Sequence, residues 1–211
     1  MSLSLIGAGR SGTDPREDFT TYTEADPQPC LTVTKHLVQA VGLDRAHDTW
    51  LYKDYTADHF QFFTHDVTFT VRSTVDHFGR LVFWAVANTV DDAKGWFDAT
   101  SEALAVLVYL GSSGLNVGVY DYSTGASDHT YYGGTILDTP LYCKITHLAA
   151  SPITLTLRGY SDEAGTNLLF TRAITVSAAT KHRYVFGVDS DHDNLGASVW
   201  TADVANLILH E

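Results

Sequence analysis

The sequence is poor in cysteine, and its two cysteines show no spacing typical of a disulfide scaffold or a metal site. Cys30 precedes the first expected strand and Cys143 lies within the segment LYCKITHL, so nothing in their positions predicts a bond between them. Because there is no CxxC pair, a cysteine-based zinc site is excluded. We expect both residues to be buried free thiols.

Long apolar runs are also lacking. No run approaches the roughly 20 residues that a membrane-spanning helix needs, so we expect a soluble chain with no membrane partner. The opening segment SLSLI is too short for a secretory signal and has no basic residues before it.

Basic residues are outnumbered: 13 Lys and Arg stand against 25 Asp and Glu, and the formal net charge is −12. A surface this acidic repels nucleic acid and anionic membranes, so we expect neither as a partner. The charge is compatible with cation binding, and a contribution to solubility alone explains it equally well.

Familiar catalytic and cofactor motifs are missing. Neither HExxH nor GxSxG occurs, and the ten histidines are scattered singly, so we expect surface or loop positions for them. Gly7, Gly9 and Gly12 match the letters of the dinucleotide-binding pattern GxGxxG. The context rejects that interpretation, because Pro15 stands where a helix should continue and no βαβ pattern follows.

Extended structure is what the sequence contains in abundance. Residues 81–88 (LVFWAVAN) and 103–110 (ALAVLVYL) are apolar runs joined by an acidic loop, and a strand that is apolar on both faces must lie inside a packed structure. Flanking segments alternate instead, as in HDVTFTVRS, which places Val67 and Val71 on one face. Turn signals separate about ten to twelve such segments, whereas only residues 92–105 could form a helix, and a short one.

These patterns predict a single all-β domain, because 211 residues, 45% of them hydrophobic, suffice for one sizeable core. We expect a jelly-roll β-sandwich of two antiparallel sheets over residues 18–211. Residues 1–17 precede the alternating pattern and are expected to form an N-terminal docking arm.

The order of these features resembles the concanavalin A-like, or laminin G-like, jelly-roll sandwich. The residues that carry the resemblance are Asp18 to Thr20, Gly42 to Arg45, Trp50 to Asp54, Phe83 to Gly95, Arg183 to Val188, and Asn206-Leu207. Similar segments recur in phage and environmental proteins, and the opening MSLSLIGAGR is similar to the starts of phage virion proteins. The resemblance implies the fold rather than an activity, because this sandwich hosts lectins, glycosidases, lyases and adhesive modules.

The catalytic patterns that the resemblance would imply are not visible in the sequence. Glycosidases on this sandwich place carboxylates at ExDxxE spacing on one strand, and no glutamate here has that spacing. Polysaccharide lyases on it pair Arg, His and Tyr on strands of the concave face. His182, Arg183 and Tyr184 are consecutive, so their side chains point to opposite faces and cannot form that group. We therefore predict that the chain is not an enzyme.

Two acidic segments are candidate calcium sites, because Ca²⁺ takes roughly six to eight hard oxygen ligands. The expected ligands are Asp189, Asp191 and Asp193 in one segment, and Asn88, Asp91 and Asp92 in the other. Trp200 occupies the twelfth position, where an EF-hand needs glutamate, so an EF-hand is excluded. Lectins and laminin G-like modules of this fold hold calcium at such rims, whereas solvated acidic turns are the alternative.

A group of tyrosines is a candidate glycan-binding patch. Tyr120, Tyr122, Tyr131 and Tyr132 lie with Asp128 near one run of turns. Aromatic rings stack on sugar rings, and carboxylates accept hydrogen bonds from hydroxyl groups. Core or edge packing of the same tyrosines is the alternative.

The N-terminal arm carries its apolar side chains at Leu3, Leu5 and Ile6, which we expect to dock on another chain. The predicted function is that of a structural or adhesive module, a phage head decoration or fibre protein. Its expected partners are capsid or tail proteins, host or environmental glycans, and further copies of itself. A calcium-dependent lectin is the alternative function, and a glycan hydrolase or lyase is the third. The expected location is the virion surface, or otherwise the extracellular space.

Overall fold

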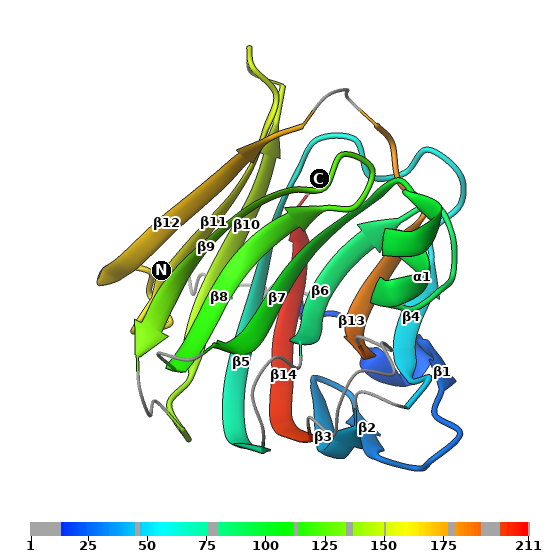
Figure 1. Ribbon diagram of the computed structural model, residues 1–211, viewed down its shortest axis with the longest axis vertical. Helices are drawn as coiled ribbons and strands as arrows, with labels where there is room; N and C mark the ends of the chain where they lie inside the picture. Colours follow the sequence, from blue (N-terminus) through cyan, green and yellow to red (C-terminus); the bar gives the residue numbers. More distant parts are fainter. Residues whose placement is uncertain are drawn as a thin grey trace, which may run out of the picture.

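The computed structural model describes residues 14–44, 47–75, 80–111, 114–133, 137–149, 151–176, 180–190 and 199–210. These residues form two seven-stranded antiparallel sheets that pack face to face as a jelly-roll sandwich (Figure 1), and the predicted fold is therefore confirmed. The described residues form 14 strands, more than the turn signals predicted, and two of the short ones, Thr23–Ala25 and Leu31–Thr34, lie at sheet edges.

The first sheet, called the front sheet, has the order β1-β4-β13-β6-β7-β8-β9. Its strands are β1 (Thr23–Ala25), β4 (Trp50–Asp54), β13 (Tyr184–Ser190), β6 (Arg80–Ala87), β7 (Ala103–Gly111), β8 (Gly114–Asp121) and β9 (Ala126–Gly133). The second, called the back sheet, has the order β12-β11-β10-β5-β14-β3-β2. Its strands are β12 (Leu168–Thr175), β11 (Thr154–Tyr160), β10 (Leu141–Leu148), β5 (Phe63–Val75), β14 (Val199–His210), β3 (Leu37–Asp44) and β2 (Leu31–Thr34). The described helices are a 3-10 turn, η1 (Phe19–Thr21), and α1 (Ala93–Ala99).

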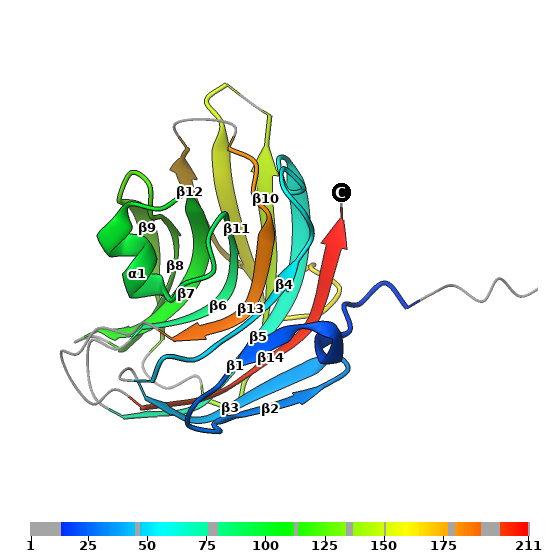
Figure 2. The same cartoon turned by 90° about the vertical axis from the view of Figure 1, so that its right-hand side faces the viewer.

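The two apolar runs form β6 and β7, which pair in the middle of the front sheet. Their inner faces contribute to the main core, where Phe83 stacks on Phe69 of β5 with ring centroids 4.2 Å apart. Their outer faces pack with a second apolar cluster beneath α1, around the fully buried Trp96. Helix α1 thus explains why strands of a surface sheet are apolar on both faces, and Figure 2 shows the helix on the outer side of the front sheet.

The sandwich is closed on one side by contacts between the edge strands β9 and β12. The Asp128 carboxylate accepts a hydrogen bond from the backbone N–H of Ala173 at 3.1 Å. Next to it, the rings of Tyr132 and Phe170 meet edge to face with centroids 5.8 Å apart. The contact uses one of the N–H groups at the edge of β12, which would otherwise offer a template for pairing with another chain.

Three histidines lie in the core, contrary to the prediction of surface or loop positions. His65, His147 and His182 are each at most 1% exposed. The indole N–H of Trp84 donates to Nδ1 of His65 at 3.1 Å, which fixes the proton of that neutral ring on Nε2. Burial lowers the pKa of all three, to about 3 for His65 and about 4 for His182. The aromatic ring packing around Phe60 and Phe63 explains why neutral imidazoles are accommodated there.

Both cysteines are buried free thiols, as the sequence predicted. No helix among the described residues is long and apolar enough to cross a membrane.

Candidate functional site

The outer face of the front sheet is divided into a covered half and an open half. Helix α1 covers the half around β13, where Trp96 meets Phe186 edge to face with centroids 4.8 Å apart. The half formed by β7, β8 and β9 contains a hollow of about 360 Å³, called the front hollow. It is lined by Arg80, Leu107, Tyr109, Gly118, Val119, Tyr120, Ser127 and His129.

Strand alternation and register bring these side chains together. Tyr109 pairs with Arg80 of β6, and Tyr120 of β8 pairs with Ser127 of β9. Gly118 pairs with His129 between those two rows. Because directly opposed residues in antiparallel strands point to the same face, polar and aromatic groups separated by up to 49 positions meet on one surface.

Gly118 forms the floor of the hollow, and its lack of a side chain is required there. A Cβ atom at this position would lie 2.7 Å from the backbone oxygen of Asp128 and 2.8 Å from Cβ of His129. Such distances are far below ordinary van der Waals contact, so any other residue would push β9 away. The glycine therefore allows His129 to lie close over β8 and leaves space between the two tyrosines.

Aromatic rings form the walls of the hollow. The Tyr109 and His129 rings meet edge to face with centroids 5.5 Å apart. On the other side, the guanidinium carbon of Arg80 lies 6.0 Å from the centre of the Tyr120 ring, within the range of a cation–π contact. Partial burial raises the pKa of the Tyr109 hydroxyl, so this group remains a neutral donor and acceptor at physiological pH.

The structure separates the five residues of the predicted glycan patch. Tyr120 lines the front hollow, and Tyr131 lies on the same face of β9 as His129 with its side chain exposed. Tyr122 is buried beside Trp96, Tyr132 packs on Phe170, and the Asp128 carboxylate binds the β12 backbone. The sequence prediction included neither Arg80 nor Tyr109, because only the register of β6 with β7 places these two residues opposite each other.

The described residues of the predicted calcium sites lie around the start of α1. Asp92 is the N-cap and accepts from the Gly95 N–H at 2.6 Å, while Asp189 accepts from the Ala93 N–H at 3.3 Å. The Asp91 carboxyl packs against Gly95, where an added Cβ atom would lie 2.3 Å from it. The Asn88 side-chain amide donates hydrogen bonds to the Glu102 carboxylate and to the Lys181 carbonyl. These hydrogen bonds satisfy backbone donors of the helix and tie its loop to the sheet.

Asp191 and Asp193 lie outside the described residues. Within the described part of the chain, no group of three or more His, Cys, Asp or Glu residues could hold a metal ion. The carboxylates of Asp92 and Asp189 thus fit helix capping, and a calcium site stays a prediction that depends on the acidic segment after β13.

The docking residues Leu3, Leu5 and Ile6 also lie outside the described residues. The first described residues are attached to the sandwich: Arg16 forms an isolated bridge with Ile208, and Glu17 donates its N–H to the Leu207 carbonyl. The Glu17 carboxylate accepts from Lys53 at 2.8 Å and from the Tyr55 hydroxyl at 2.6 Å. The arm and its boundary at residue 18 remain predictions.

No protein-family model matches the sequence, and no curated protein matches it. Solved structures do match the fold. The carbohydrate recognition domain of Emp46p in a potassium-bound form is 15% identical, with a TM-score of 0.57 over 95% of this chain and 93% of that one. The exoplasmic/lumenal domain of VIP36 bound to Ca²⁺ and Man2 is 10% identical, with a TM-score of 0.54 over 88% and 81%.

A third similar structure is alginate lyase Aly36B in complex with an alginate trisaccharide. It is 13% identical, with a TM-score of 0.57 over 92% of this chain and 89% of that one. Identities this low show a shared fold and no more. The chain is therefore similar in fold to two lectin-type domains and a lyase, and these comparisons do not show the predicted similarity to phage virion proteins.

Proposed function

We propose that this protein is a carbohydrate-binding module whose ligand occupies the front hollow. The observation that carries the proposal is the group of Tyr109, Tyr120 and His129 around the glycine floor at Gly118. The volume of about 360 Å³ lies within the range of small-ligand sites, and two of the similar folds are described as bound to saccharides.

The lining groups match the two kinds of surface on a sugar. The apolar C–H face of a pyranose ring would stack on Tyr120, whose position is supported by Arg80. Sugar hydroxyls would exchange hydrogen bonds with the Tyr109 hydroxyl, the His129 imidazole and the Ser127 hydroxyl. The hollow contains no carboxylate among its lining residues and one cationic group, Arg80, so neutral and acidic sugars are both suitable and basic ones are disfavoured.

A glycan array followed by calorimetry tests the proposal. The Tyr120→Ala variant should bind the selected glycan at least tenfold more weakly, a loss of about 1.4 kcal/mol. Tyr131→Ala is the matched control, because Tyr131 is an exposed tyrosine on the same face of β9 outside the hollow. Equal losses in both variants, or binding of no glycan by the wild-type chain, would overturn the assignment.

Calcium dependence is a separate proposal that the same measurement addresses. Emp46p and VIP36 are described with potassium and calcium respectively, and Asp191 and Asp193 supply further carboxylates in this chain. Binding measured with calcium and with a chelator should differ if an ion orders the hollow. Equal affinities in the two conditions would remove calcium from the proposal and leave carbohydrate binding intact.

A second candidate function is cleavage of a uronate polymer, and one observation favours it. Arg80, His129 and the tyrosines combine in one hollow the residue types that lyases of this sandwich use. Arg80 would neutralise the carboxylate of the sugar. His129 would remove the proton α to that carboxylate, and a tyrosine hydroxyl would protonate the leaving oxygen as the C–O bond breaks and a C=C bond forms.

The ultraviolet absorbance of the unsaturated product tests this candidate. Alginate incubated with the full chain should gain absorbance, and His129→Ala should abolish the gain. Binding of alginate without any absorbance change would make the protein a binding module and not a lyase.

The virion role remains a proposal from the opening residues MSLSLIGAGR. It concerns where the module is displayed, as a capsid or tail component, and it is compatible with glycan binding. Deleting residues 1–13 should leave glycan binding unchanged and abolish assembly onto a virion partner. Loss of glycan binding on deletion would instead assign these residues to the sandwich.

A further inference from the structure

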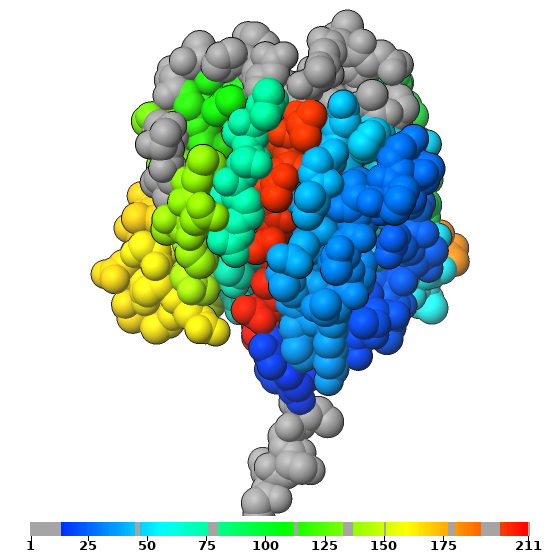
Figure 3. Space-filling model, turned by 90° about the horizontal axis from the view of Figure 1, so that it is seen from below, coloured from blue at the N-terminus to red at the C-terminus, as the bar shows by residue number. Residues whose placement is uncertain are grey.

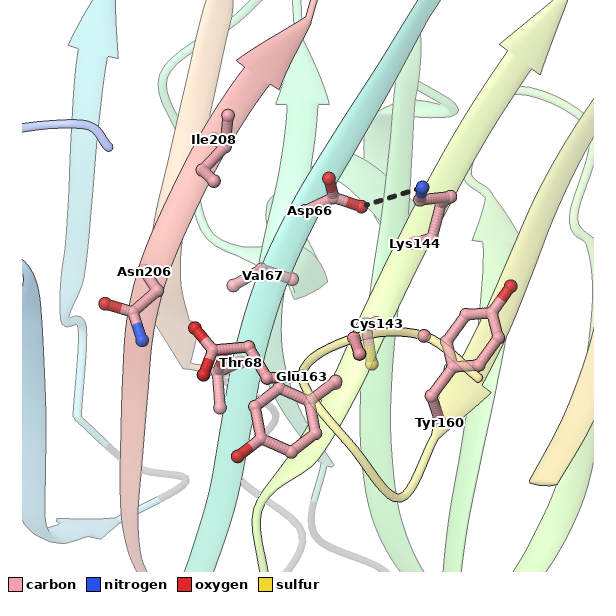
Figure 4. A pocket seen from close by; sticks show the side chains of 12 residues that line it. Asp66, Val67, Thr68, Cys143, Lys144, Tyr160, Glu163, Asn206 and Ile208 are labelled. Carbon is pink, nitrogen blue, oxygen red and sulfur yellow. Dashed lines mark ion pairs between the residues drawn. The ribbon is translucent and has the colours of Figure 1, made fainter. Parts of the chain in front are cut away.

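The outer face of the back sheet carries a second hollow, of about 300 Å³, which is called the back hollow. Figure 3 shows this face, with β14 lying between β5 and β3, and Figure 4 shows the hollow from close by. Its lining residues come from four strands and one loop: Asp66, Val67, Thr68, Tyr142, Cys143, Lys144, Tyr160, Glu163, Ala164, Gly165, Asn206 and Ile208.

Register places a polar and aromatic row across the floor. Thr68 of β5 pairs with Tyr142 of β10, which pairs in turn with Tyr160 of β11. All three are half-buried and point outward from the sheet, opposite to the core residues beside them. Two tyrosine rings on neighbouring strands about 4.8 Å apart give an aromatic surface of the width of a sugar ring.

A β-bulge in β14 directs Asn206 to the end of this row. The pairing of β14 with β5 shifts between Ala205 and Ile208, and Asn206 has the left-handed φ of 54°. Its Oδ1 accepts from Arg16 at 3.2 Å, so its amide N–H groups point the other way, and Figure 4 shows them on the side of Thr68. Bulges that hold a residue in this conformation often re-aim a side chain toward a functional surface.

The loop after β11 forms the opposite wall and is held together by hydrogen bonds to one carboxylate. The Asp162 carboxylate accepts from the Thr166 N–H at 3.0 Å, the Thr166 hydroxyl at 2.7 Å and the Asn167 N–H at 2.6 Å. Gly165 has a φ of +66°, and a Cβ atom added there would lie 4.0 Å from the Tyr160 ring. This loop holds the Glu163 carboxylate over the sheet near Thr68, as Figure 4 shows. These internal hydrogen bonds favour a wall that needs little ordering when a ligand binds.

The charges within the back hollow largely compensate one another. Lys144 lies 3.8 Å from Asp66, and Asp66 also meets His210 at 2.9 Å. Glu163 lies within electrostatic range of Arg16. A phosphate or sulfate would find only one lysine, already beside a carboxylate, and a cation would meet that lysine. What the hollow offers is a mixed set of charged and neutral donors and acceptors beside two aromatic rings.

We propose that the back hollow is a second binding site, for a neutral saccharide unit. The rings of Tyr142 and Tyr160 would stack on the sugar, and Thr68, Asn206 and Glu163 would hydrogen-bond its hydroxyls. The proposal shares its ligand class with the front hollow but uses different residues on the opposite sheet. With both sites occupied, one chain would bridge two glycan strands, or two segments of one strand, and gain avidity.

The test follows backbone amide signals of the isotope-labelled full chain during titration with neutral disaccharides of glucose, mannose and galactose. Signals of Gly165 and Asn206 report on the back hollow, and that of Gly118 reports on the front hollow. At least one sugar should shift Gly165 and Asn206 in a saturable way. Tyr160→Ala should weaken this response at least tenfold, and Tyr120→Ala should leave it unchanged.

Glu163→Gln provides a second variant that leaves the fold intact, because Glu163 is on an exposed loop. It should weaken the Gly165 response while the Gly118 signal and the unfolding midpoint stay at their wild-type values. If no neutral sugar shifts Gly165, or if Tyr120→Ala removes its response, the back site is wrong. A Gly165 response without any Gly118 response would leave the back site standing and would exclude these neutral sugars as ligands of the front hollow.

Discussion

The front and back hollows are built by opposite means on the same pair of sheets. In the front hollow a side chain is missing: Gly118 lowers the floor, and regular strands supply the walls. In the back hollow backbone is added: a bulge aims Asn206, and a capped loop carries Glu163. A sandwich face can therefore gain a binding surface in two ways. Either a strand residue lacks a Cβ atom, or the regular hydrogen-bond pairing between two strands is interrupted.

The two hollows also differ in charge. Arg80 is the cation at the front hollow and no carboxylate lines it, whereas the back hollow contains Asp66 and Glu163 together with Lys144. With a net charge of −12, the rest of the surface repels acidic polymers. An acidic glycan would therefore reach only the front hollow, and its binding should strengthen with added salt as that repulsion is screened.

The largest effect is expected where α1 covers the front sheet. Trp96 is fully buried, so Trp96→Ala should lower the free energy of unfolding by about 3–5 kcal/mol. Urea unfolding measures the change, and Phe97→Ala is the control, because that neighbouring ring is 50% exposed and should cost little. A similar loss in both variants would mean that α1 is not packed as the structure shows.

The core histidines predict a loss of stability in acid that affects both hollows together. Because the unfolded chain takes up protons near pH 6.5 and the buried rings resist them, the unfolded state binds more protons below that pH. Stability should therefore be complete above about pH 6.5 and decrease as the pH falls toward about 4, the folded-state pKa of His182.

Urea midpoints measured between pH 7.5 and pH 4.5 test this expectation. The titratable groups that act electrostatically on His182 are His147 and Asp121, and those that act on His65 are His210 and His59. His65→Gln should flatten part of the pH dependence, whereas His129→Gln, at an exposed position, should not. A midpoint that does not change with pH would contradict the buried neutral state of these rings.

The next largest effect is expected from a substitution at Gly118, the floor of the front hollow. Gly118→Ala places a Cβ atom against the Asp128 backbone and should cost about 1–3 kcal/mol while weakening glycan binding. Ser127→Ala, at an exposed neighbouring position, should leave stability within about 0.5 kcal/mol of wild type. Urea unfolding measures the stability of both variants, and calorimetry measures their glycan affinity. A Gly118→Ala protein with wild-type stability and wild-type glycan affinity would mean that β9 is not held this close to β8.

The sequence was sufficient for the sandwich and insufficient for its sites. Apolar runs and alternation reveal β6, β7 and β5, because the inward and outward positions of a strand are local properties. The hollows depend on which strands become neighbours: Tyr109 meets His129 only through the pairing of β7, β8 and β9. Likewise, the bulge at Asn206 follows from the register of β14 with β5 and has no signature in the residues themselves.

The acidic loop before α1 shows how one composition supports two interpretations. Its clustered acids, like the alternating acids that begin at Asp189, predicted calcium ligands, yet Asp92 and Asp189 accept hydrogen bonds from backbone N–H groups in the first turn of the helix. A carboxylate near that end is stabilised by the exposed N–H groups, so a short helix beside a strand attracts acidic residues for purely structural reasons. Only the geometry of the loop distinguishes a carboxylate that caps the helix from one that binds calcium.

The smallest predicted effect tests that distinction. Asp92→Ala removes the N-cap acceptor of the Gly95 N–H and should lower the free energy of unfolding by about 1 kcal/mol in the presence or absence of calcium. Asp98→Ala, which loses only an exposed pair with Lys94, should cost about 0.3–0.5 kcal/mol and serves as the control. If a chelator lowers the wild-type midpoint by as much as Asp92→Ala does, and has no effect on that variant, Asp92 is a calcium ligand. The capping geometry argues against this outcome, because the Asp92 oxygen that accepts from the Gly95 N–H at 2.6 Å already has a hydrogen-bond partner. The stability lost in Asp92→Ala should therefore be independent of any ion.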